Sequence, residues 1–139
     1  MSKTKLDELE HLMKLEKAAK DFKTFIELTK PDYQFNWHHQ YMIDRFQKLP
    51  SQQRQRIIIA MPPRCGKSEL VSRRLPAWYL GQNPNCRIIT ASYSQQLASL
   101  FNRDVQRIME DPIYDEIFPD TVMGGTSAAK VLEDGMGFN

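Results

Sequence analysis

The chain has 139 residues, which is enough for one domain with a hydrophobic core. Its 19 Lys and Arg residues nearly balance its 17 Asp and Glu residues, so the net charge of +2 gives no argument for nucleic-acid binding from charge alone. The two cysteines and an N-terminus unlike a signal peptide fit a reducing cytosol, and no apolar run approaches the roughly 18 residues that cross a membrane. We therefore expect a soluble protein of the cytoplasm without a disulfide framework.

The N-terminal region predicts a helix. Apolar side chains recur near the helical period over residues 4–29, at Leu9, Leu12, Met13, Ala19, Phe22 and Ile26. Lys30-Pro31 ends this run, because proline disfavours helix in the residue before it. We expect residues 1–30 to form a helical arm that packs on a domain formed by residues 31–139. A helix that binds a partner protein is the alternative.

A second helix and a first strand follow. The segment FNWHHQYMIDRFQKL (35–49) predicts a helix with four candidate core residues, Trp37, Tyr41, Phe46 and Leu49. The run RIIIAM (56–61) is rich in β-branched residues and does not alternate with polar ones. That composition predicts a strand that is buried on both faces.

The next predicted helix contains a proline. It covers residues 67–80, and Gly81 is expected to close it because glycine readily adopts the left-handed conformation at a helix C-terminus. Pro76 is expected to kink it, since the proline ring clashes with the carbonyl group one turn back.

A second strand and a further helix complete the pattern. Residues 86–92 (CRIITAS) predict another buried strand, and Ser92 with Gln95 resembles a capping box. The helix that follows ends at Pro112 and has one apolar face, formed by Leu97, Phe101, Val105 and Ile108. Strands that alternate with helices predict an α/β fold with a parallel sheet and right-handed crossovers.

The loop MPPRCGKSEL (61–70) lies between the first strand and its helix. Its Gly66-Lys67-Ser68 tripeptide is typical of the end of a phosphate-binding loop, although Met61 occupies the position of the usual first glycine. A strand directly before the tripeptide and a helix directly after it are the context that such a loop requires. A chance tripeptide at the head of a helix is the alternative.

The chemistry of a phosphate loop depends on this geometry. Backbone N–H groups of the loop and of the helix N-terminus would face the phosphates, and Pro62-Pro63 could stiffen the turn where the first glycine is missing. Lys67 would contact the β- and γ-phosphates, and Ser68 would give its hydroxyl to Mg²⁺. Gly66 would let the backbone approach closely.

Four segments of the chain resemble the N-terminal ATPase part of phage terminase large subunits: WHHQYMIDRF, IIIAMPPRCGKSELVSRRLPAWYLG, IITASYSQQLASLFNRDVQRIM and DPIYDEIFP. The resemblance covers about residues 18–120, and the family commonly lacks the first glycine of the loop. It implies a P-loop NTPase of the RecA-like type, a three-layer α/β sandwich with a parallel sheet, here truncated and preceded by the helical arm. The implied function is ATP-driven packaging of double-stranded DNA into a procapsid, followed by cleavage by a C-terminal nuclease.

The resemblance also implies a set of site residues. Lys67 and Ser68 match the phosphate and Mg²⁺ contacts, and Arg64 matches an arginine that senses or stabilises the γ-phosphate. Gln40 matches a glutamine that reads adenine. The implied ATP-binding set is Gln40, Pro62, Pro63, Arg64, Cys65, Gly66, Lys67, Ser68 and Glu69, with Lys67 and Arg64 catalytic and Ser68 the metal ligand. The alternatives are a salt bridge that shapes the loop for Arg64, and a surface position on a helix for Gln40.

Two further pairs of residues have competing interpretations. His38 and His39 have no matching metal partner, so we interpret them as packing or capping residues. The ASYS segment resembles the helicase-type motif that couples nucleotide state to DNA contacts, but Ser92 and Ser94 fit plain helix caps equally well.

The catalytic acids of this class are missing. ATP hydrolysis needs an acidic pair after a hydrophobic strand, to hold Mg²⁺ and to activate water. The segment KVLEDG (130–135) offers Glu133 and Asp134, but only two apolar residues precede them, so we reject it as that strand. Residues 121–139 hold four of the six glycines and show no period, like a chain cut off within a domain. We expect this chain alone to be inactive, whereas the full-length protein would be an ATPase and an endonuclease.

The family resemblance implies double-stranded DNA, a portal protein and a small terminase subunit as partners. It also implies a homo-oligomeric ring for the full-length protein, in the host-cell cytoplasm and without a membrane. Arg73 and Arg74 are interpreted as a solvated helix face or as interdomain contacts rather than as DNA ligands. The alternatives to this function are a helicase-like P-loop ATPase and a short protein that binds nucleotide or partner proteins without catalysis.

Overall fold

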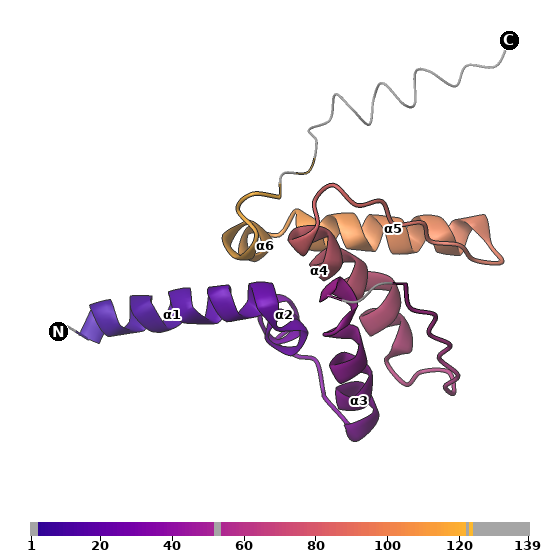
Figure 1. The fold of residues 1–139 in the computed structure, drawn as a ribbon, viewed down its shortest axis with the longest axis horizontal. Coiled ribbons are helices and arrows are strands. Elements are labelled where there is room, and N and C mark those ends of the chain that lie inside the picture. The colour runs from indigo at the N-terminus through magenta and orange to yellow at the C-terminus, as the bar shows by residue number, and fades with distance from the viewer. Residues whose placement is uncertain (1–2, 52–53, 122, 124–139) are drawn as a thin grey trace, which may run out of the picture.

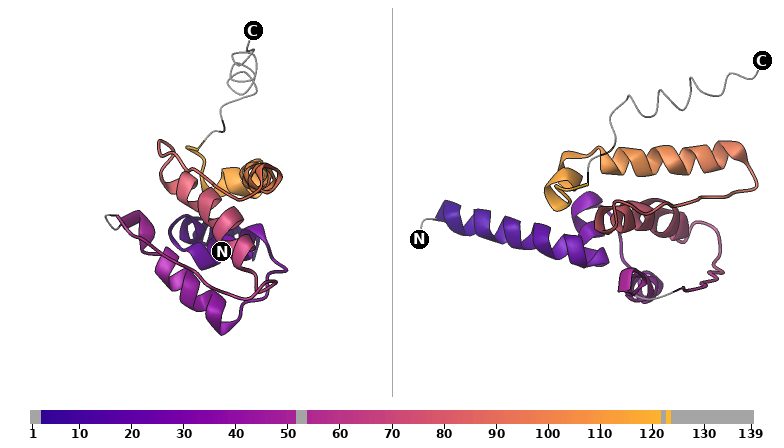
Figure 2. Two further views of the ribbon diagram at one scale, coloured as in Figure 1. Left: turned by 90° about the vertical axis from the view of Figure 1, so that its right-hand side faces the viewer. Right: turned by 45° about the horizontal axis from the view of Figure 1, so that its top comes forward.

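The computed structural model describes residues 3–51, 54–121 and 123, and every regular element in this part of the chain is a helix (Figure 1). The elements are α1 (Lys3–Lys20), α2 (Phe22–Thr29), α3 (Trp37–Phe46), the 3₁₀ turn η1 (Leu49–Ser51), the π-helical η2 (Glu69–Arg74), α4 (Leu75–Gln82), α5 (Gln95–Met109) and α6 (Pro112–Ile117). Helix α1 extends outward on one side of the molecule and α5 on the other (Figures 1 and 2). None of the described helices is long and apolar enough to span a bilayer.

The N-terminal helical region is two helices, because Asp21 caps the second one. Asp21 has an extended backbone, and its carboxylate accepts a hydrogen bond from the Thr24 N–H at 2.9 Å. A side-chain cap of this kind starts a new helix. Helix α2 ends at Thr29, as expected ahead of Pro31. The extent predicted for the helical region is confirmed, but the break at Asp21 was missed.

The hydrophobic core forms where α1, α2, η2, α4 and α6 meet, and α3 and α5 add buried side chains at its edges. Its completely buried side chains are Ala18, Phe22, Phe25, Ile26, Leu70, Ala77, Trp78 and Tyr114. The Trp78 indole N–H donates to the Ala18 carbonyl at 3.1 Å, and the Tyr114 hydroxyl donates to the Ala77 carbonyl at 2.8 Å. The polar atoms of both aromatic side chains are therefore paired where water cannot reach them. The end of α1 and the buried face of α2 share this core with the rest of the molecule.

Helix α3 confirms the helix predicted over residues 35–49, but two of its expected core residues are exposed. Phe46 is buried and Leu49 packs against the core, as predicted. Trp37 is 84% exposed and Tyr41 is 60% exposed, so their assignment to the core is wrong. The buried stripe of the helix is instead His39, Met42, Ile43 and Phe46. Trp37 and Tyr41 are four residues apart and lie on a second stripe of the helix, which faces away from the core.

Pro76 lies just after a π-helical turn. The N–H of Leu75 donates to the carbonyl of Leu70, five residues back, and Pro76 sits in the first turn of α4. A wider turn ahead of the proline removes the clash between its ring and a carbonyl that α-helical geometry would place against it. The distortion expected at Pro76 is therefore present as a π-helical turn.

Gly81 lies inside α4, so the prediction that it closes this helix is wrong. The helix continues to Gln82 and is capped at Asn83. A Cβ atom at Gly81 would lie 2.4 Å from the ring of Phe118. Glycine is therefore needed here for close packing between α4 and the residue that ends α6.

The cap of α5 differs from the predicted one. Ser94, not Ser92, is the N-cap, and its hydroxyl accepts the Leu97 N–H at 3.4 Å. On the predicted apolar face of this helix, Val105 and Ile108 are buried. The helix ends at Met109, before Pro112 begins α6.

The predicted parallel sheet is wrong for the described part of the chain. Residues 56–61 and 86–92 are extended, but neither segment pairs with another described strand. Ile58 and Ile89 are 96% and 93% exposed, whereas Ile59 is partly buried against the core. An interior strand of a parallel sheet needs hydrogen-bonding neighbours at both edges and cover on both faces, and these segments have neither. The three-layer α/β sandwich of a P-loop NTPase is thus replaced by a helical fold with two extended segments.

Candidate functional site

The loop over residues 61–68 leads directly into a helix. The N–H of Leu70 donates to the Gly66 carbonyl at 3.3 Å, so the helical turn starts at the end of the loop. Arg64 and Gly66 are left-handed, with φ angles of 64° and 76°, whereas Cys65 between them is not. Left-handed residues that alternate with others turn neighbouring backbone N–H groups toward one side, and such concavities bind anions. The backbone of the loop is therefore suited to hold a phosphate.

Gly66 is required at its position for two reasons. Its left-handed backbone is unfavourable for a residue with a side chain. In addition, a Cβ atom at Gly66 would lie 2.7 Å from Nε2 of His39 and 2.9 Å from the Tyr33 hydroxyl oxygen. The loop thus rests on two side chains that come from the segment before it.

His39 connects helix α3 to the loop. Its Nδ1 atom accepts the Asn36 N–H at 3.1 Å, which forms part of a capping box at the start of α3. Its Nε2 atom is 2.8 Å from the carbonyl oxygen of Cys65. The side chain is buried, with 6% exposure. The interpretation of His39 as a capping residue is confirmed, and its contact with the loop was not anticipated.

Tyr33 lies beside His39, and both side chains lie against Gly66 of the loop. The centroids of these two rings are 5.3 Å apart. The Tyr33 hydroxyl is buried and has no hydrogen-bond partner among the described residues. Burial, with a smaller contribution from the Glu69 carboxylate, raises the pKa of Tyr33 to about 12. The hydroxyl therefore keeps its proton at neutral pH.

The side chains of Arg64, Lys67 and Ser68 have no interaction partner among the described residues. Within the described residues, none of the three forms a side-chain hydrogen bond or an ion pair. Arg64 is exposed, and Lys67 and Ser68 are half-buried at the head of the helix. A cationic side chain without a carboxylate partner next to a turn of backbone N–H groups gives the loop a positive potential.

The other predicted site residues are hydrogen-bonded elsewhere or make few contacts. The Gln40 amide donates to the Asp44 carboxylate at 2.9 Å on the same helix, and it is His39, not Gln40, that contacts the loop. Pro62 and Pro63 are exposed, and the Cys65 thiol makes only a long contact of 3.8 Å with the Pro63 carbonyl.

Glu69, the carboxylate nearest the head of the helix, is held by arginines. Its carboxylate pairs with Arg74 at 2.8 Å and with Arg73 at 3.6 Å. Arg73 also donates to Asp104 on α5 at 2.7 Å, and Arg74 donates to the Thr29 carbonyl at 3.1 Å. Both guanidinium groups are therefore committed to contacts within the molecule, so their interpretation as a solvated helix face is wrong.

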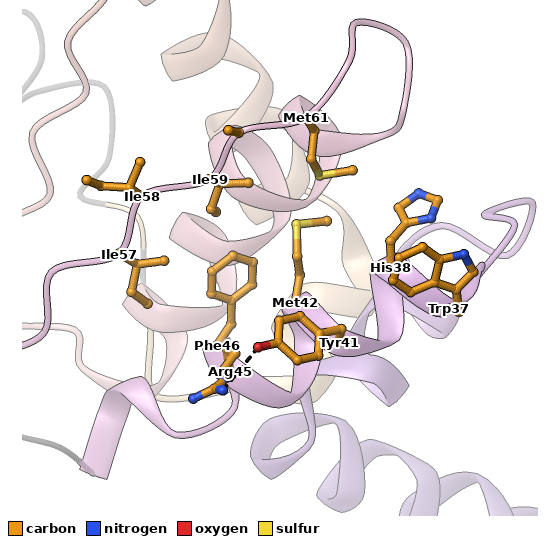
Figure 3. A pocket seen from close by; sticks show the side chains of 11 residues that line it. Trp37, His38, Tyr41, Met42, Arg45, Phe46, Ile57, Ile58, Ile59 and Met61 are labelled. Carbon is orange, nitrogen blue, oxygen red and sulfur yellow. Dashed lines mark hydrogen bonds between the residues drawn. The ribbon is translucent and has the colours of Figure 1, made fainter.

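An apolar groove lies beside the loop. It has a volume of about 250 Å³ and runs between α3 and residues 57–61. Phe46 and Met42 project from the helix toward the extended segment, while Tyr41 receives a hydrogen bond from Arg45 at 3.1 Å (Figure 3). The groove ends at Met61, where the loop begins.

The described residues contain no group of three His, Cys, Asp or Glu side chains that could hold a metal ion. The His38 and His39 rings pack together with centroids 4.0 Å apart and planes tilted by 55°, which agrees with the packing role expected for them. The Nε2 atom of His38 is buried and has no partner in this part of the chain.

The sequence did not predict that Tyr33 and His39 contact the loop, where both side chains lie against Gly66. The spacing of Asn36 and His39 signals a helix cap, but no local pattern connects position 39 to position 65. Their role depends on a contact between distant parts of the chain.

One protein family matches the sequence over residues 58–132, and it is described as terminase large subunit, T4likevirus-type, N-terminal. Comparisons with curated proteins and with solved structures gave no match. The matched segment includes the whole loop and the helices that follow it.

Proposed function

The chain belongs to the family of T4-like terminase large subunits, of which it matches the N-terminal part, and we propose that residues 61–68 bind the triphosphate of ATP in a viral DNA-packaging motor. The observation that carries this proposal is the backbone of the loop. Two left-handed residues, Arg64 and Gly66, stand on either side of Cys65. Lys67 and Ser68 follow directly before η2, and neither side chain is paired within the described residues. Phosphate groups are held by this combination of backbone N–H groups, helix N-terminus and cation.

The residues of the loop fit a triphosphate. Gly66 lets the backbone of the loop lie directly against His39 and Tyr33, where a Cβ atom would clash. Lys67 has no competing carboxylate among the described residues. The fit to Mg²⁺ is limited to the Ser68 hydroxyl, because the adjacent Glu69 carboxylate is held by two arginines.

Each side chain then has a proposed role. Lys67 would place its ammonium group on the β- and γ-phosphates, and Ser68 would contribute its hydroxyl to the Mg²⁺ shell. Arg64 is exposed and unpaired within the described residues, and its guanidinium group would neutralise charge that develops on the γ-phosphate. Mg²⁺, when bound, would offset the negative charge of the phosphates.

The proposed adenine contact of Gln40 requires a rearrangement. Its amide is bonded to Asp44, so it would have to release this carboxylate before it could bond an adenine edge with one donor and one acceptor. The proposal for Gln40 therefore has less support than the proposal for the loop.

For the whole motor we propose ATP-driven movement of double-stranded DNA into a procapsid. The portal protein, a small terminase subunit and further copies of the large subunit are its proposed partners. Family membership supports this role. For these 139 residues we propose nucleotide binding without turnover, because no described carboxylate is both near the loop and free to orient an attacking water.

A binding experiment with a matched lysine tests the proposal. Isothermal titration of the chain with Mg²⁺-ATP is expected to give a measurable affinity that falls at least about ten-fold in Lys67→Ala, since a charge-assisted contact to phosphate is lost. Lys14→Ala removes an exposed lysine from α1 and should leave the affinity unchanged. Circular dichroism would establish that both variants are folded. Equal affinities for the two variants would contradict the proposal.

A further inference from the structure

We propose that His39 is a positioning residue for the phosphate loop: it holds the carbonyl group of Cys65 and thereby turns the N–H of Gly66 toward a bound phosphate. This inference rests on the proposed nucleotide-binding function of the loop. It concerns a side chain that lies 26 positions before the backbone group it contacts.

The two hydrogen bonds of His39 define its tautomer. Nδ1 accepts the Asn36 N–H at 3.1 Å, so this nitrogen carries no proton in the neutral ring. The proton is therefore on Nε2, which donates to the Cys65 carbonyl oxygen at 2.8 Å. With 6% of the side chain exposed, water cannot easily replace either bond.

Peptide geometry transmits this contact to the opposite side of the loop. The described chain has no cis peptide bond, so the Cys65 C=O and the Gly66 N–H point in opposite directions across one planar unit. Because the carbonyl oxygen points inward to His39, the Gly66 N–H points outward. An N–H held in this direction can donate to an anion in the concavity formed around Arg64 and Gly66.

The contact also lowers the cost of binding. The peptide between Cys65 and Gly66 could otherwise rotate, since Gly66 tolerates many backbone conformations. His39 is fixed by its own cap on α3 and packs against Tyr33, so it can hold that peptide before the ligand arrives. A donor oriented in advance loses less conformational freedom on binding.

Two neutral substitutions of similar length separate the hydrogen bond from the packing. In His39→Gln, the side-chain oxygen can accept the Asn36 N–H, as glutamine does in capping boxes, and the amide can donate to Cys65. In His39→Met, the volume is retained but neither bond can form. Mg²⁺-ATP affinity of the full chain is expected to fall about ten-fold in His39→Met and to stay within about three-fold of the unmodified chain in His39→Gln.

Two controls distinguish the contact with the loop from general effects on α3. His38→Met replaces the neighbouring ring that packs on His39 but removes neither hydrogen bond of His39, so it should leave the affinity unchanged. Asn36→Ala weakens the cap of α3 but leaves the Nε2 donor, so it should lower the melting temperature without weakening ATP binding. An Asn36→Ala variant that binds as weakly as His39→Met would assign the effect to the cap and overturn the proposal.

A measurement without nucleotide completes the test. Nitrogen NMR shifts of ¹⁵N-labelled histidine are expected to show the Nε2–H tautomer for His39, and an Nδ1–H tautomer would refute the proposed donor. Equal ATP affinities in the Met and Gln variants would remove this inference and leave the proposed function intact. If the unmodified chain did not bind Mg²⁺-ATP, the proposed function would fail and this inference with it.

Discussion

Arg64 is held in a backbone conformation that costs free energy. A residue with a side chain loses roughly 1–2 kcal/mol in the left-handed region, and Arg64 has a φ of 64°. Its side chain is exposed and forms no hydrogen bond or ion pair within the described residues that would offset this cost. Strained residues of this kind persist where the surrounding structure fixes them, and they concentrate at functional sites. The strain at Arg64 therefore agrees with the proposed role of the loop.

Replacing Arg64 should reveal this strain. Arg64→Gly releases it, whereas Arg64→Ala keeps a Cβ atom in the left-handed region. The free energy of unfolding, measured by urea denaturation, is expected to be about 1 kcal/mol higher for the Gly variant than for the Ala variant. The comparison between the two variants removes the effect of losing the guanidinium group. Equal stabilities, or a more stable Ala variant, would show that the position is not strained.

Helices in this chain were predictable where local signals decide them. The proline after Lys30 and the apolar stripe through Val105 and Ile108 depend on residues a few positions apart, and both predictions are confirmed. The extended segments were assigned to a sheet because their composition suits a buried strand. A strand also needs a partner that the local sequence cannot supply, and Ile58 remains open to solvent.

The candidate site was predictable only where a local sequence pattern marks it. The tripeptide Gly66-Lys67-Ser68 identified the loop by local pattern, and the left-handed glycine follows from it. Support by Tyr33 and His39 depends on a contact across more than 25 residues, which no spacing rule reports. Gln40 was singled out by family resemblance, whereas the structure brings its neighbour His39 to the loop.

Close packing between α4 and Phe118, the residue after α6, requires a glycine at position 81. A Cβ atom there would be 2.4 Å from the Phe118 ring, which is buried and cannot move without disturbing the core. Gly81→Ala should therefore lower the free energy of unfolding by about 1–3 kcal/mol, although alanine favours helix more than glycine does.

A double-mutant cycle would assign that loss to the contact. Phe118→Leu shortens the opposing side chain, so combining it with Gly81→Ala should cost less than the two single changes added together. Urea unfolding of the four proteins gives the coupling energy. Strict additivity, or a Gly81→Ala variant as stable as the unmodified chain, would show that the ring and the backbone of α4 can separate freely.

The molecule as a whole combines a well-packed helical core with two exposed apolar segments. Ile58 and Ile89 are almost completely exposed. Apolar grooves of about 250 and 360 Å³ lie along their segments. Extended backbone without a paired strand among the described residues also presents N–H and C=O groups that can pair with another chain. Charge does little to oppose association, since the net charge is only +2.

Lysine at Ile58 and Ile89 should reduce self-association without loss of stability. Neither side chain is packed, so removing it creates no cavity, and the two added charges repel other copies of the chain. Light scattering at high protein concentration should show less aggregate in the double variant, while its melting temperature stays within a few degrees of the unmodified chain. Ile59→Lys is the matched control, because Ile59 packs against the core and its replacement should cost about 2 kcal/mol. If lysine at Ile58 and Ile89 destabilised the chain as much as lysine at Ile59, both isoleucines would be buried in solution, and the extended segments would have a cover that the described residues do not supply.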